Sequence, residues 1–404
     1  MYAVRASRPV CAGIKLINCF RWTDSHDDLR YVVESARLRG IRVIPEFDTP
    51  AHSSSWNVGY PGTTIFCGCM EQPCPPGSFD PATGNPSHYS DVLNPVSNET
   101  FALVSGFFTE MSSIFPDEQV HIGVDEVLWS CLNRSAEVVD FIKSHGKKLD
   151  DDGYKFAVRY YIKRVQTFLA SLGKKTSVWQ EALGKYGPGN HGGPFDKDHY
   201  VSINHELLRG TTVEFWLGPA WYQTDSDCAN RPADEKECGG KAVVSNVTDA
   251  VVNGHYALSL EPYLGEESTW PGVYTSDPAT NRSCTYPEGV TGGKRAWNCT
   301  CMEEGNQTDT APHAAYPGGC YDYADDDPWF KSIHGGEACM WGEGKNASNI
   351  NLVAWPGALS LAERLWSARE VNNVDAATPR VMAHMRRLRN RGVPVRPPGP
   401  MEDW

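Results

Sequence analysis

The stretch "VHIGVDEVLW", residues 120–129, places two acids, Asp125 and Glu126, at the end of an apolar run. The run predicts a buried β-strand. Buried carboxylates are costly unless they are paired, hydrogen-bonded or used in chemistry, so a strand that ends in two acids points to a functional site. An acid pair that only caps or forms ion pairs is the alternative, because a similar pair, Asp234 and Glu235, stands in a polar segment.

Helical patterns alternate with β-rich runs on both sides of this strand. We expect helices over 27–40, 101–115 and 153–172, the last capped by Asp151 or Asp152, and two more that end near residue 391. In the first helix, Leu29, Val32, Val33 and Ala36 form one apolar face. The expected strands cover residues 41–49, 119–127, 176–183, 211–216, 256–262 and 332–343.

This alternation is typical of a parallel sheet covered by helices, and we count six strand-to-helix units. Polar and aromatic residues gather where the expected strands end. In a (β/α)8 TIM barrel the active site lies at that edge, so the pattern predicts a barrel of the α/β class. These residues are Asp48, His52, Asp125, Glu126, Trp179, Glu181, Trp216, Tyr263, Trp341 and Glu343.

Charge and hydropathy limit the partners. The formal net charge of −13, with no basic stripe, argues against nucleic acid. No apolar run approaches the roughly 18 residues of a spanning helix, so we expect no membrane span. The ligand should be neutral or weakly charged.

Cysteine usage predicts an oxidising compartment. The chain has 13 cysteines, several crowded together as in "CGCMEQPC", and their irregular spacings favour disulfides over the alternative of zinc sites. Seven glycosylation triplets support passage through the secretory pathway, to a lysosome, a vacuole or the extracellular space. No signal peptide is visible, so we expect a truncated or misassigned N-terminus. The triplets begin at Asn98, Asn133, Asn246, Asn281, Asn298, Asn306 and Asn346.

Four motifs resemble those of the β-N-acetylhexosaminidases of glycoside hydrolase family 20, of the eukaryotic lysosomal and secreted type. In chain order they are "ARLRGIRVIPEFDTPAHSSSW", "HIGVDEVLWSC", "VWQEAL" and "GGEACMWGE" followed by "AERLWS". The resemblance implies a catalytic barrel domain over 27–395, with a long insertion near 276–331 and a tail at 396–404. The family's N-terminal α/β domain and its first one or two barrel strands, with a sugar-binding arginine, are not recognisable in the divergent segment 1–26.

The resemblance also implies how the two acids act. The substrate's own acetamido oxygen attacks the anomeric carbon, so one protein acid suffices for proton transfer. Glu126 matches the general acid, and Asp125 matches the carboxylate that orients the acetamido group and offsets its positive charge. His52 resembles the histidine that supports the general acid, although an exposed loop histidine is the alternative.

Other matched residues are expected to form the sugar pocket. Trp179, Trp216 and Trp341 match the tryptophans around the acetamido methyl group, although a barrel tryptophan can also be core. Tyr263 matches the tyrosine that hydrogen-bonds the acetamide oxygen. Glu343 matches a carboxylate that binds distal sugar hydroxyls, or is a solvated loop acid. Cys131 is expected to pair with a cysteine of the segment 67–74.

The implied activity is exo-acting hydrolysis of terminal β-linked N-acetylglucosamine or N-acetylgalactosamine, without metal or other cofactor and with a homodimer as an option. A non-catalytic sugar-binding relative is the alternative, and a glycosidase with a protein nucleophile is less favoured. The chain departs from the family pattern at Val124 and Ala51, where glycine is usual, and at Pro262, where an aromatic residue is common. A β-branched residue at 124 should restrict the backbone next to the acids.

Overall fold

The computed structural model describes residues 25–60, 62–65, 79–80, 85–86, 92–127, 129–182, 208, 210–215, 253–259, 270–275, 282–285, 298–301, 333–340, 346–368 and 370–396. The chain divides into two compact units. One comprises residues 2–213 and 246–252, and the other comprises 214–245 and 253–404. Among the described residues, the helices are all too short or too polar to cross a membrane.

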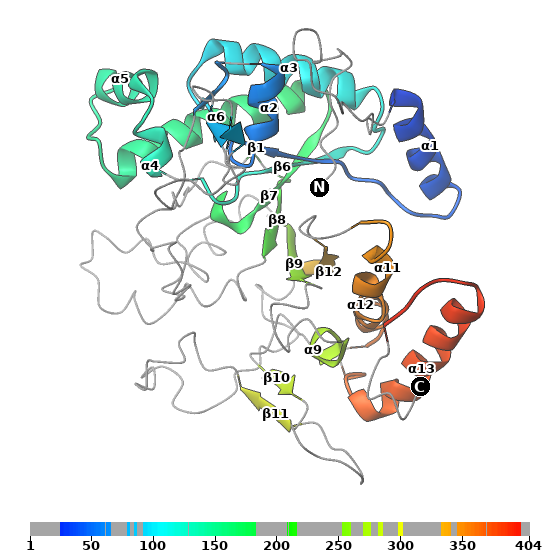
Figure 1. The fold of residues 1–404 in the computed structure, drawn as a ribbon. Coiled ribbons are helices and arrows are strands. Elements are labelled where there is room, and N and C mark those ends of the chain that lie inside the picture. Colours follow the sequence, from blue (N-terminus) through cyan, green and yellow to red (C-terminus); the bar gives the residue numbers. More distant parts are fainter. Residues whose placement is uncertain are drawn as a thin grey trace. The chain divides into compact units, whose positions relative to one another are not determined.

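The first unit is built on three parallel strands, in the order β1 (Glu46–Thr49), β6 (Gln119–Gly123) and β7 (Lys175–Trp179) (Figure 1). The chain passes through α3 (Asn98–Ser112) between β1 and β6, and through α6 (Asp151–Ser171) between β6 and β7. Smaller elements lie in the connections: α1 (His26–Arg37), α2 (Ser54–Gly59), β2 (Thr64–Ile65), β3 (Phe79–Asp80), β4 (Asn85–Pro86), β5 (Val92–Leu93), α4 (Trp129–Leu132), α5 (Ala136–Ser144) and the 3-10 turn Gln180–Ala182.

Strand alternation sends apolar side chains to the helices and polar ones to the opposite face. Phe47 of β1 packs edge-on against Phe107 and Phe108 of α3, with ring centroids 4.7 and 6.0 Å apart. Because successive strand residues point to opposite faces, Glu46 and Asp48 point away from these helices. The sheet face that lacks these helices is therefore the one that carries acids.

The predicted helix 27–40 forms as α1, but its apolar face is not buried. Ser25 caps it through a capping box with Asp28, and Gly40 follows its end with φ of +72°. None of the α1 side chains is buried, and Tyr31 and Val32 are 74% and 54% exposed. The amphipathic pattern therefore predicted the helix correctly but not its burial.

The N-cap predicted for the long helix was wrong by one residue. α6 begins at Asp151, and its cap is Asp150, whose Oδ1 accepts a hydrogen bond from the Gly153 N–H at 3.2 Å. The run of three acids, Asp150 to Asp152, supplies the same side chain at successive positions. Only the first has the extended backbone of a cap, with φ −133° and ψ −176°.

The second unit holds the parallel pair β9 (Asn253–Ser259) and β12 (Ile333–Cys339), while β8 (Thr212–Phe215) spans the boundary between the units. Its helices are α9 (Trp270–Thr275), α11 (Ile350–Ala354), α12 (Gly357–Leu365) and α13 (Val374–Asn390), and β10 (Arg282–Thr285) pairs antiparallel with β11 (Asn298–Cys301). Its core joins α9 to α13 through Trp270, Tyr274, Val374, Ala377, Val381 and Met385. The helical ending predicted near residue 391 is confirmed by α13.

Candidate active site

The ends of β1 and β6 bring two sequence motifs together. The strands are parallel neighbours with Thr49 opposite Gly123, so their carboxyl ends lie at the same edge of the sheet. Asp48 and His52 come from the end of β1 and the turn after it, and Asp125 follows β6 directly. The arrangement explains why acids from sequence positions far apart meet at one place.

The backbone adopts a left-handed conformation at the end of β6 and around the two acids that follow it. Gly123, Val124 and Glu126 have φ of +77°, +81° and +52°, and the strand stops at Gly123 rather than continuing to 127 as predicted. Val124 is fully buried, and its N–H donates to the Thr49 carbonyl at 3.0 Å. A β-branched residue is strained at positive φ. The backbone restriction expected at Val124 is therefore present as a strained, left-handed conformation.

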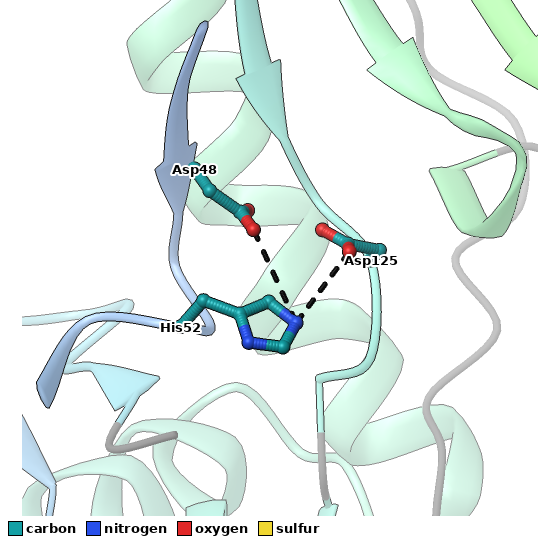
Figure 2. Close-up of side chains that lie close together, drawn as sticks. All are labelled: Asp48, His52 and Asp125. Carbon is teal, nitrogen blue, oxygen red and sulfur yellow. Dashed lines mark ion pairs between the residues drawn. The ribbon is translucent and has the colours of Figure 1, made fainter. Parts of the chain in front are cut away.

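His52 lies among three carboxylates, as Figure 2 shows for two of them. Its Nε2 is 3.1 Å from Glu126 Oε2, 3.5 Å from Asp125 Oδ2 and 4.0 Å from Asp48 Oδ2. Burial by itself would lower the pKa of His52. Hydrogen bonds to Asp125 and Glu126 and the nearby negative charge overcome that effect and raise the pKa well above its ordinary value.

The acids differ in their access to solvent. The side chains of Asp48 and Asp125 are 2% and 11% exposed, whereas that of Glu126 is 33% exposed. Burial would raise the pKa of Asp125, but the hydrogen bond and positive charge of His52 hold it below its usual range. Glu126 is therefore the acid that a substrate can reach, and Asp125 is a buried anion behind it.

One side-chain oxygen or nitrogen from each of Asp48, His52 and Asp125 lies within 4.8 Å of the other two. Carboxylate oxygens and imidazole nitrogens are also atoms that bind metal ions. A metal would need a lone pair on His52 Nε2. That nitrogen faces carboxylate oxygens of Asp125 and Glu126, an arrangement that favours a proton on it. The three side chains therefore fit a proton-linked cluster.

A further polar network, which the sequence did not predict, lies on the same face of the sheet. The indole N–H of Trp179 donates to Glu46 Oε1 at 3.0 Å, and His121 Nδ1 lies 3.3 Å from the same oxygen. The ring of Trp179 is 2% exposed and meets His121 edge-on at 5.0 Å. The alternation in "EFDT" puts Glu46 on the same face of the strand as Asp48, and this pattern could have indicated that Glu46 belongs to the polar face.

Four of the expected site residues, Trp216, Tyr263, Trp341 and Glu343, lie outside the described residues. The structure thus brings together Asp125, Glu126 and His52, with Trp179 on the same face. Cys131, just after the acids, is disulfide-bonded. Its predicted pairing with a cysteine of residues 67–74 stays a prediction, since that segment is also outside the described residues.

Parallel strands with acids at their carboxyl ends define a protein of the α/β class. A family model described as "Glycosyl hydrolase family 20, catalytic domain" matches residues 18–235 and 273–369. The chain therefore belongs to glycosyl hydrolase family 20.

Curated relatives agree with this family. The chain is 28% identical over 371 residues to the beta-hexosaminidase subunit beta of Homo sapiens, with 92% of this chain and 50% of that protein covered. It is 30% identical over 377 residues to the subunit alpha of Bos taurus, with 92% and 53% covered. The chain thus spans about half the length of the curated relatives it matches.

Solved structures show the same fold. An exo beta-N-acetylglucosaminidase of this family from Vibrio harveyi, in complex with N-acetylglucosamine, aligns with a TM-score of 0.55 at 19% identity, covering 94% of this chain and 47% of that one. The chitobiase of Flavobacterium johnsoniae aligns with a TM-score of 0.57 at 19% identity, covering 92% and 43%. At this identity the likeness supports the barrel-type fold, and the activity must be argued from the site.

Proposed function

We propose that this chain hydrolyses terminal, non-reducing β-linked N-acetylhexosamine residues of glycans, with retention of configuration and with the substrate's acetamido group as nucleophile. The observation that carries the proposal is the cluster at the ends of β1 and β6. A solvent-accessible acid, Glu126, and a buried anion, Asp125, both lie within 3.5 Å of one imidazole. Membership of family 20 supplies the reaction class.

The two acids divide the chemistry according to their exposure. Glu126 donates a proton to the leaving oxygen while the acetamido oxygen forms a bond to the anomeric carbon. His52, at 3.1 Å, stabilises the Glu126 carboxylate that remains. Water then opens the oxazolinium ring, and Glu126 accepts a proton from that water.

Asp125 supplies a fixed negative charge to the transition state. It accepts a hydrogen bond from the acetamido N–H and offsets the positive charge that develops there as the ring closes. Its lowered pKa, caused by His52 against the effect of burial, keeps it ionised in a mildly acidic compartment. An anion placed in advance at low solvent exposure costs little reorganisation during the reaction.

The remaining sugar contacts are assigned through the family motifs. Trp179, Trp216 and Trp341 surround the acetamido methyl group, Tyr263 binds the acetamide oxygen, and Glu343 binds distal hydroxyls. The parallel strands belong to a (β/α)8 barrel whose carboxyl ends carry these residues. The glycosylation triplets and the cysteine usage support a location in the secretory pathway.

Release of a chromophore from an aryl β-N-acetylglucosaminide tests the proposal. We expect turnover, inhibition by a thiazoline that mimics the oxazolinium, and no turnover of the aryl β-glucoside, which lacks the acetamido group. The aryl β-N-acetylgalactosaminide, run in parallel, measures the sugar preference. Thiazoline binding without turnover would instead support the non-catalytic relative, and turnover of the glucoside would support a protein nucleophile.

A further inference from the structure

Asp48 is the most deeply buried acid of the site, and the chemistry proposed above does not use it. Its side chain is 2% exposed. Neither Oδ1 nor Oδ2 accepts a hydrogen bond from any described residue, and the same holds for Oδ1 of Asp125. An ionised carboxylate in this position would have no donor among the described residues, which is costly in a buried site.

The backbone of β6 is shaped to admit this carboxyl group. Gly123 lies directly against it, because a Cβ built on Gly123 would stand 1.7 Å from Asp48 Oδ1. Figure 2 shows the carboxyl groups of Asp48 and Asp125 turned toward each other above the ring of His52. One carboxylate oxygen of Asp48 and one of Asp125 lie within 4.8 Å of each other.

His52 cannot neutralise all the acids around it. Its one Nε2–H is closest to Glu126 and next closest to Asp125, and the contact with Asp48 is the longest at 4.0 Å. With Glu126 protonated for its role as general acid, the carboxylates of Asp48 and Asp125 beside a single imidazolium still leave excess negative charge in a buried place. A proton on one carboxyl group removes the repulsion and also creates a donor.

We propose that Asp48 is a positioning residue that holds a proton and donates it in a hydrogen bond to the carboxylate of Asp125. The bond fixes Asp125 from behind, while the other lone pairs of Asp125 remain for His52 and for the acetamido N–H. The role of this bond in turnover rests on the function proposed above. The protonation of Asp48 itself does not.

The surroundings of Asp48 agree with a neutral acid. Burial, followed by the negative charge of Asp125, raises the pKa of Asp48 well above its ordinary value. Charged groups that face it are His52 after β1, Asp125 after β6 and Glu46 on β1. On the helix side lies Tyr161 of α6, which is 0% exposed and whose pKa is raised by burial, so it adds no charge.

Infrared spectroscopy of the full chain tests the protonation without any turnover. At about pH 6, where ordinary carboxyl groups are ionised, the spectrum of the parent minus that of Asp48→Asn should show the C=O stretch of a neutral carboxylic acid, because the proton of the general acid Glu126 is present in both and cancels. The same subtraction with Asp117→Asn, at an acid paired with Arg42 at 2.8 Å, should show no such band. Absence of the band from the Asp48→Asn difference spectrum overturns the proposal.

Turnover of the activated aryl substrate tests the positioning. Asp48→Asn keeps a donor and should retain kcat within about tenfold, whereas Asp48→Leu has no donor and should lose on the order of a hundredfold in kcat, with a smaller change in KM. Equal losses in both variants, or none in either, contradict the role. Thermal unfolding checks that both variants fold, and the infrared result stands if Asp48→Leu does not.

The two readouts separate this proposal from the proposed function. If the parent never cleaves the substrate, the hydrolase proposal fails and the infrared band still decides the state of Asp48. If the parent cleaves but the Asp48→Asn difference spectrum shows no neutral-acid band, only the Asp48 proposal fails.

Discussion

The neighbouring acids Asp125 and Glu126 differ in the exposure of their side chains to solvent. Glu126 is accessible to a third of its surface, whereas Asp125 is nearly enclosed, although the two are adjacent in sequence. The positive φ of Glu126 turns its side chain away from the course that a continuing strand would give. In the proposed mechanism, exposure rather than residue type thus distinguishes the proton donor from the fixed anion at this strand end.

Glu126→Gln should separate substrates by their leaving groups. Loss of the general acid should slow turnover of glycosides with poor leaving groups by roughly 100- to 10,000-fold. Activated aryl glycosides should suffer far less in the glycosylation step, because a good leaving group needs little protonation. The measurement is kcat/KM for a leaving-group series, and equal losses across that series would remove the acid role from Glu126.

His52 should make the stability of the protein depend on pH. Its folded pKa is raised above the unfolded value of about 6.5, so the folded state binds more protons than the unfolded state between these two pKa values. This contribution is fully present below the unfolded pKa and is lost as pH rises through the folded one. The free energy of unfolding should therefore fall above about pH 6.5, by at most about 1.4 kcal/mol per pH unit for this group.

Urea unfolding at a series of pH values measures this effect. The variant His52→Gln should have a flatter dependence between neutral and mildly alkaline pH than the parent. If the two dependences coincide, His52 does not titrate with a raised pKa in the folded protein.

At the scale of elements, the end of β6 requires glycine at position 123 and tolerates a strained valine at position 124. Gly123→Ala would put a Cβ on the Asp48 carboxyl group at a residue whose φ is +77°. We expect a loss of more than about 2 kcal/mol in the free energy of unfolding, together with lost turnover.

Gly106→Ala is the matched control for that substitution. Gly106 lies within α3, and nothing stands within 4 Å of its added Cβ. Alanine there should stabilise the protein by about 0.5–1 kcal/mol, because glycine is unfavourable inside a helix. Similar effects of the two substitutions in denaturant unfolding would argue against the close approach of Asp48 to Gly123.

The cap of α6 gives a second test at this scale. Asp150→Ala removes the acceptor for the Gly153 N–H and should cost about 1 kcal/mol. Asp152→Ala, at a side chain that is 90% exposed, should cost less than about 0.5 kcal/mol. Denaturant midpoints at constant slope compare the two, and an equal or larger effect at Asp152 would mean that the cap is misassigned.

Across the whole molecule, hydrophobic periodicity predicted the alternation of helices and strands, and strand ends predicted the place of Asp125 and Glu126. Hydrophobic periodicity could not predict that α1 would bury no side chain, because the pattern identifies an apolar helix face but not the elements that cover it. The contact of Glu46 with Trp179 was also missed, since it joins residues 133 positions apart. The need for Gly123 likewise depends on the depth of Asp48, which only packing determines.

If the substrate's acetamido oxygen is the nucleophile, as proposed, the basicity of that oxygen should control the rate of the reaction. Aryl glucosaminides whose N-acyl methyl group carries none, one, two or three fluorine atoms share a leaving group but have progressively weaker nucleophilic oxygens. We predict that kcat/KM falls steeply with each fluorine, because the attacking oxygen carries positive charge in the transition state. Rates that do not change along this series would contradict the mechanism and indicate a nucleophile supplied by the protein or by water.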